Sequence, residues 1–112
     1  MAIDTVAVPT GATETVILSL GVGDLRAAAR VSIQLVNLTE DQFFSGWVYR
    51  KKYGMSAWAR AKLTDFQSIG PGGSEMADVD VYDSDLLEVR GTYDGDGGDI
   101  EVGTSFRKGF RT

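Results

Sequence analysis

Apolar and polar residues alternate with a period of two along much of this 112-residue chain. The clearest case is residues 30–37, where Val31, Ile33 and Leu35 alternate with polar side chains. Successive side chains of a strand point to opposite faces, so the pattern predicts a strand with one buried and one solvated face. The same alternation predicts further strands at 14–20, 78–82, 87–93 and 99–106.

The alternation also groups side chains by face. In residues 14–20 it places Val16, Leu18 and Leu20 together and Ile17 opposite, and at the end of the chain it continues an inward row to Phe106. The other predicted inward residues are Val79, Val81, Leu87, Val89, Tyr93, Ile100 and Val102.

Two segments are harder to orient. Residues 42–53 are apolar on both faces, with Phe43, Trp47 and Tyr49 on one and Phe44, Gly46 and Val48 on the other. This favours burial against a second layer or a partner, or a central strand with a bulge at Gly46. Residues 56–63 are rich in Ala, yet their place after Tyr53-Gly54 favours the return strand of a hairpin.

The breaks between these segments carry turn residues, and the chain has 14 Gly and only 2 Pro. Pro9 ends a short N-terminal strand at 3–8, and GPGGS at 70–74 predicts a tight turn. DGDGG at 94–98 predicts a hairpin loop, because Gly and Asp tolerate positive φ. Residues 24–29 predict one helical turn with Asp24 as its N-cap.

Seven to nine short strands with no long helix predict an all-β protein, an antiparallel β-sandwich of immunoglobulin-like or jelly-roll type. The length fits a single domain over residues 1–112. Within it we expect the short N-terminal strand at 3–8, able to add to the sheet of a neighbour, and a docking tail at 107–112.

The chain has no His and no Cys. This excludes disulfides, zinc sites with these ligands, thiol nucleophiles and imidazole bases, so we expect no enzyme and no cofactor. Paired carboxylates leave glycoside hydrolysis as a minority alternative. DGDGGD at 94–99 departs from the EF-hand pattern at Gly98, Asp99 and Ser105, so we predict no metal site.

The net charge of −5 is unevenly distributed. Residues 41–62 carry five bases and one acid (+4), and residues 63–101 carry eleven acids and one base (−10). Such blocks can attract subunits head to tail, or simply be solvated surface. The acidic block makes nucleic acid an unlikely partner. No signal peptide or membrane-spanning run is recognisable, so we expect a soluble protein made in a cytoplasm.

Two basic, aromatic segments are the candidate contact regions. WVYRKKY at 47–53 combines rings and positive charge, a mixture that also occurs in single-strand nucleic-acid binders. FRKGFRT at 106–112 keeps two Phe beyond the last strong strand, which favours docking over a frayed end. The predicted partner-binding residues are Trp47, Tyr49, Arg50, Lys51, Lys52, Phe106, Arg107, Phe110 and Arg111.

Several runs together resemble the small β-sandwich accessory proteins of tailed-phage virions. They are RVSIQLVNL (30–38), FSGWVYR (44–50), IGPGGS (69–74) with ADVDV (77–81), and LEVRGT (87–92) followed by the Gly-rich loop. The resemblance covers residues 14–106. It implies a structural virion protein that decorates or cements a phage capsid as a symmetric homo-oligomer, bound to the major capsid protein or another virion protein.

A binding module of another class is the alternative. A β-sandwich can also bind carbohydrate or a receptor, as a component of a fibre or tail, with Trp47 or Trp58 as the stacking platform. Fluorescence of the two Trp residues in the presence of sugars separates this function from the structural one.

Overall fold

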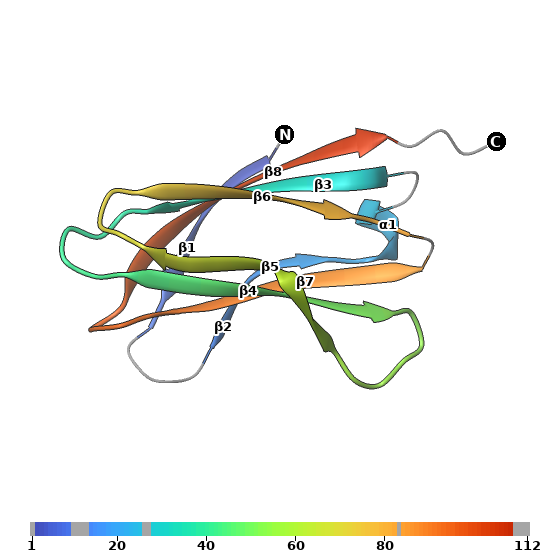
Figure 1. Cartoon of the computed structure of the whole chain (residues 1–112), viewed down its shortest axis with the longest axis horizontal. Coiled ribbons are helices and arrows are strands. Elements are labelled where there is room, and N and C mark those ends of the chain that lie inside the picture. Colours follow the sequence, from blue (N-terminus) through green and yellow to red (C-terminus); the bar gives the residue numbers. More distant parts are fainter. Residues whose placement is uncertain (1, 10–13, 26–27, 83, 109–112) are drawn as a thin grey trace.

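The computed structural model describes residues 2–9, 14–25, 28–82 and 84–108, and only the backbone of residues 22, 28–29 and 61–64. The described chain forms two four-stranded antiparallel sheets that pack face to face (Figure 1). One sheet contains, in spatial order, β1 (Ala2–Val8), β8 (Gly98–Lys108), β3 (Ala28–Asn37) and β6 (Ser74–Asp80). The other contains β2 (Thr15–Leu20), β7 (Asp85–Tyr93), β4 (Phe44–Lys52) and β5 (Ala59–Ile69). The predicted all-β sandwich is confirmed.

The strand order identifies a jelly roll. β1 pairs with β8, β2 with β7, β3 with β6 and β4 with β5, so the chain runs as one long ribbon folded at the β4–β5 turn. Along this ribbon the strand pairs alternate between the two sheets. In one sheet β3 also pairs with β8, which joins the β1–β8 and β3–β6 pairs. In the other, β4 pairs with β7 and joins the β2–β7 and β4–β5 pairs. In an immunoglobulin domain, with the strands numbered in chain order, one sheet has the order 1-2-5-4 and the other 3-6-7. The two sheets of this chain do not have these orders.

The core lies between the sheets and follows the alternation of the sequence. Val31, Ile33 and Leu35 of β3 are fully buried, as are Phe44 and Val48 of β4. The other predicted inward residues, up to Val102, are also buried; they belong to β6, β7 and β8, except Val81, which directly follows β6: Val79, Val81, Leu87, Val89, Tyr93, Ile100 and Val102. The alternation of the sequence was sufficient to predict these buried residues because one face of each strand is apolar and the other is polar.

β4 is a central strand, between β7 and β5. Phe44, Gly46 and Val48 face the core, whereas Trp47 and Tyr49 point outward and are half-buried. Its pairing with β7 is regular through Gly46, and the register shift against β5 between Phe44 and Gly46 comes from an extra residue in β5, between Phe66 and Ile69. The central position of β4 is therefore confirmed, but the bulge lies in β5 and not at Gly46. The predicted return strand at 56–63 is confirmed from residue 59 onward.

Four other local predictions were wrong. In β2 the register against β7 shifts between Val16 and Leu18, so Ile17 and Leu20 are buried while Val16 is exposed. The Gly-rich loop at 94–97 links β7 to β8 in the opposite sheet, so it is a crossing connection and not a hairpin. Phe106 lies opposite Val31 on the core-facing side, but at the end of the sandwich, where it is 43% exposed.

The fourth concerns the helical turn. α1 spans Val22–Leu25, earlier than predicted, and Asp24 is inside it. The carboxylate of Asp24 accepts a hydrogen bond from the backbone N–H of Gly21, at 2.8 Å. Asp24 therefore caps the helix from its third position, as the acidic partner of a capping box does, and Gly21 occupies the N-cap.

Candidate protein-interaction surfaces

The outer face of the β2-β7-β4-β5 sheet carries a cluster of aromatic and cationic side chains. Trp47 and Tyr49 of β4 point outward between the neighbouring strands. Arg90 of β7 lies opposite Trp47, and Arg60 of β5 lies opposite Tyr49. Directly opposed residues share a face, so the sheet brings these side chains together. We call this surface the aromatic–cation face; its members are Trp47, Tyr49, Lys51, Trp58, Arg60 and Arg90.

The cations of this face stack on its rings. The guanidinium carbon of Arg90 lies 4.1 Å from the centroid of the Tyr49 ring, and that of Arg60 lies 5.2 Å from the Trp47 ring. The Lys51 ammonium lies 5.1 Å from the Trp58 ring. Contacts of this length are cation–π interactions. They fix the rings and the cations in one arrangement.

Acidic neighbours hold the two guanidinium groups in place. Arg90 forms an ion pair with Glu88, at 2.9 Å, and Arg60 forms one with Asp65, also at 2.9 Å. Each arginine is thus held by a carboxylate and a ring at once. The face is therefore ordered before any partner arrives, which lowers the entropy lost on binding.

The hydroxyl of Tyr49 donates a hydrogen bond to the carboxylate of Glu14, with oxygen distances of 2.8 and 3.1 Å. Burial raises the pKa of this hydroxyl, and the hydrogen bond and the charge of Glu14 raise it further. Tyr49 consequently remains a neutral donor at any physiological pH.

Arg50 and Lys52 lie on the other side of β4 from the aromatic–cation face. The pleat turns them toward the end of the sandwich, where both approach the buried carboxylate of Asp85. The Tyr82 ring lies 5.8 Å from each of their cationic groups. Arg50 also donates a hydrogen bond to the backbone carbonyl of Asp80, which links the two sheets. The basic run of β4 is thus divided between two surfaces.

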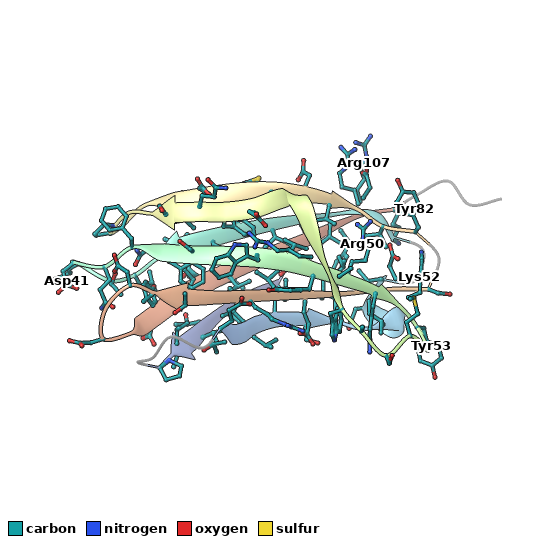
Figure 2. The ribbon with its side chains drawn as sticks, turned by 60° about the horizontal axis from the view of Figure 1, so that its bottom comes forward. Asp41, Arg50, Lys52, Tyr53, Tyr82 and Arg107 are labelled. Carbon is teal, nitrogen blue, oxygen red and sulfur yellow. The ribbon has the colours of Figure 1, made fainter. Side chains whose placement is uncertain are left out.

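The end of β8 lies at the same end of the molecule. Figure 2 shows Arg107 near Tyr82, on the side of the molecule that also holds Arg50 and Lys52. In the sheet Arg107 is opposite Arg30, which pairs with Asp80 at 3.0 Å. Phe110 and Arg111 lie outside the described residues. The segment 3–8 belongs to β1, which pairs with β8 of its own chain.

The structure therefore separates the predicted contact residues. Trp47, Tyr49 and Lys51 share the aromatic–cation face, whereas Arg50, Lys52, Phe106 and Arg107 lie toward one end of the sandwich. Sequence reasoning missed Arg60 and Arg90 as members of the face. The alternation of 87–93 did point Arg90 outward, but its place opposite Trp47 depends on the order of the strands.

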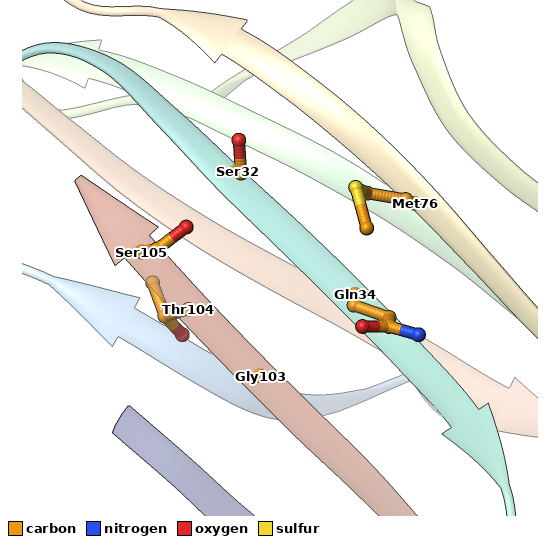
Figure 3. Close-up of a pocket in the computed structure, with 6 residues that line it drawn as sticks. All are labelled: Ser32, Gln34, Met76, Gly103, Thr104 and Ser105. Atoms are coloured by element: carbon orange, nitrogen blue, oxygen red, sulfur yellow. The ribbon is translucent and has the colours of Figure 1, made fainter. Parts of the chain in front are cut away.

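The outer face of the other sheet is different in character. A shallow groove of about 180 Å³ runs across β3, β6 and β8, lined by uncharged residues that include Ser32, Gln34, Met76 and Gly103 (Figure 3). It has no carboxylate, Lys or Arg among its lining residues. Nowhere in the described residues do three or more acidic side chains come close enough to hold a metal ion.

No helix of the described chain is long and apolar enough to cross a membrane. Comparison with known proteins finds no matching protein family, no similar curated protein and no similar solved structure.

Proposed function

We propose that this protein is a structural virion component that attaches to a tailed-phage capsid and decorates or stabilises it. The observation that supports this most directly is the aromatic–cation face. It combines two Trp, one Tyr and two Arg on one sheet surface, and these are the residue types that dominate the binding energy of protein interfaces. The capsid as partner rests on the sequence resemblance over residues 14–106.

The fold is compatible with this role. Jelly rolls occur in viral capsid proteins, although they occur in lectins too, so the fold by itself does not choose between the two. The sandwich buries a continuous apolar core without disulfides, and its surface is free to carry contacts. A protein of this kind acts by adhesion and needs no cofactor.

A protein partner suits the aromatic–cation face better than a sugar does. A sugar-binding platform needs a ring face that is open to stack on the pyranose. Here Arg60 lies over the Trp47 ring, and Lys51 and Arg90 lie near the Trp58 ring. These cations, in contrast, are well placed to meet carboxylates of a protein surface.

The test is binding to capsids. The proposal predicts that a major capsid protein is encoded near this gene. Particles of that capsid protein are assembled without this protein and mixed with the purified chain. We expect saturable co-sedimentation with the particles at a fixed ratio to the capsid protein. Trp47→Ala should weaken binding by at least tenfold, because central aromatic residues carry about 2 kcal/mol or more.

Gln34→Ala, on the outer face of the opposite sheet, is the matched control and should bind like the wild type. The proposal is wrong if the wild-type chain does not bind the particles. It is also wrong if Gln34→Ala abolishes binding while Trp47→Ala leaves it intact. Quenching of Trp fluorescence by a sugar, without particle binding, would favour the carbohydrate-binding alternative.

A further inference from the structure

The folded chain separates its charge along the long axis. The β3–β4 loop and the β7–β8 loop lie together at one end, where the side chain of Gln42 bonds to the backbone of Gly97 at both its oxygen and its nitrogen. Residues 37–44 and 93–99 contain no Lys or Arg. We call this end the acidic end; its exposed carboxylates belong to Glu40, Asp41, Asp94, Asp96 and Asp99.

The opposite end holds a basic pocket beside the β4–β5 turn. It has a volume of about 280 Å³ and is lined by four cationic residues and a single acidic one, Asp85. Asp85 is buried and already paired with Lys52 and Arg50. The pocket therefore presents a net positive charge to solvent. Figure 2 shows the two ends, with Asp41 at one and Arg50, Lys52 and Tyr53 toward the other.

Both ends also carry apolar surface. Leu38 and Phe43 are each 47% exposed at the acidic end. Met55, Ala57 and Ala59 form the apolar part of the pocket, and Met55 is itself largely exposed. Each end is thus a mixture of charge and apolar surface, and the signs of the charges are opposite. Such patches are complementary in both respects.

We propose that the basic pocket of one copy binds the acidic end of a second copy, with Glu40, Asp41 and Phe43 entering the pocket. The two surfaces are different, so the contact is heterologous: a pair of copies keeps one free pocket, on one copy, and one free acidic end, on the other. Such contacts continue until a ring closes or a filament grows. A second copy presents at its acidic end both kinds of surface that the pocket can contact: carboxylates for its cations, and the exposed Leu38 and Phe43 for its apolar residues.

This inference does not rest on the capsid proposal. The pocket adjoins the aromatic–cation face and shares Lys51 and Arg60 with it. The variants that test the pocket are therefore taken from residues outside that face. Ala57 is exposed and lines the pocket, so Ala57→Glu introduces a repelling charge there without removing an ion pair.

Sedimentation velocity over a concentration series measures the association with the chain alone. We expect the wild type to associate at about 50 mM salt and to dissociate at about 500 mM, because exposed charges are screened. Ala57→Glu, and separately Glu40→Gln with Asp41→Asn, should each weaken association by about tenfold or more. Gln34→Glu, which adds the same charge as Ala57→Glu but on the outer face of the other sheet, should associate like the wild type.

Mixing the two weakened variants distinguishes a heterologous contact from a symmetric one. The Ala57→Glu chain keeps a native acidic end, and the Glu40→Gln, Asp41→Asn chain keeps a native pocket. Together they should form 1:1 dimers that do not grow. A wild type that stays monomeric at low salt overturns the proposal. So does association that Ala57→Glu leaves unchanged, or a mixture that forms no dimers.

Discussion

The ammonium nitrogen of Lys52 lies 2.7 Å from a carboxylate oxygen of Asp85, whose side chain is completely buried. The second carboxylate oxygen accepts a hydrogen bond from the backbone N–H of Tyr82, at 2.8 Å, and lies 3.7 Å from Arg50. A buried carboxylate costs free energy unless such partners compensate for its lost hydration. Asp85 thereby ties the start of β7 to the end of β4 and to the β6–β7 turn.

Asp85→Ala should lower the free energy of unfolding by about 2–3 kcal/mol. This is below the cost typical of a broken buried ion pair, since Lys52 and Arg50 keep access to water once the carboxylate is gone. Urea denaturation measures the change. Asp80→Ala is the control, because the exposed pair of Asp80 with Arg30 contributes at most about 1 kcal/mol. Equal effects of the two substitutions would contradict the structural role of Asp85.

The fully buried side chain of Asn37 joins the β3–β4 loop to the end of β5. Its Nδ2 donates hydrogen bonds to the carbonyls of Gln42 and Ile69, at 2.7 and 2.9 Å, and its Oδ1 accepts from the N–H and the hydroxyl of Thr39. Asn37→Ala removes these four hydrogen bonds, and of their partners the Gln42 carbonyl keeps the Thr39 hydroxyl as a donor, at 3.2 Å. We expect a loss of about 2–4 kcal/mol, since each buried group left without a partner costs about 1–3 kcal/mol.

Asn37→Asp separates hydrogen bonding from shape at the same position. The substituted oxygen would face two carbonyl oxygens and could not donate to them. Urea denaturation at neutral pH should therefore show Asn37→Asp to be at least as destabilised as Asn37→Ala, although it keeps the volume of the side chain. A stability close to that of the wild type would mean that the loops do not depend on these bonds.

Gly91 allows Phe44 to lie across the central strands. A Cβ atom at position 91 would overlap the Phe44 ring and lie 2.8 Å from the carbonyl oxygen of Ser45. Gly91→Ala should therefore lower the free energy of unfolding by about 1–3 kcal/mol. Gly103→Ala is the matched control, because its nearest neighbours would be 3.9 Å away. Combining Gly91→Ala with Phe44→Leu should recover part of the loss, which a double-mutant cycle measures.

The inner faces of β3, β6, β7 and β8 could be predicted because alternation is a local property of consecutive residues. The strand order could not be predicted in this way. The ladder that pairs Val31 with Phe106 joins residues far apart in the sequence, and nothing local distinguishes it from the ladders of an immunoglobulin sandwich. The prediction that Ile17 points away from the core was wrong for a similar reason. The register shift of β2 lies in its pairing with β7, which is distant in the sequence.

The candidate surfaces, too, could be predicted only where they depend on consecutive residues and not on the order of the strands. The aromatic and basic composition of 47–53 marked β4 as a contact strand. Its alternation put Trp47 and Arg50 on opposite faces, but only the position of the core shows that the face with Trp47 points outward. Arg90 joins Tyr49 only because β7 and β4 are neighbours. The acidic end combines the acids of two loops, Glu40 and Asp41 from one and Asp94 and Asp96 from the other, which belong to different charge blocks of the sequence.

The hydroxyl of Tyr93 provides a test of stability against pH. It is buried and donates a hydrogen bond to the backbone carbonyl of Asp99, at 2.6 Å. Burial, with a further contribution from the Asp99 carboxylate, raises the pKa of Tyr93 from 10.0 to about 12. The folded state therefore favours the neutral phenol. The stabilisation is complete below pH 10 and is lost as the pH rises from 10 toward 12, by about 2–3 kcal/mol in total.

Tyr93→Phe removes this titration and keeps the ring that packs edge-on against Phe44. At pH 8 the variant should be less stable than the wild type by about 1 kcal/mol, the usual contribution of one hydrogen bond. Urea denaturation between pH 8 and 11 should show this difference shrinking as the pH rises above 10, because only the wild type must keep a buried phenol protonated. All other groups are the same in both proteins, so their contributions cancel. A difference that stays constant over this range would show that Tyr93 ionises as readily in the folded chain as in the unfolded one.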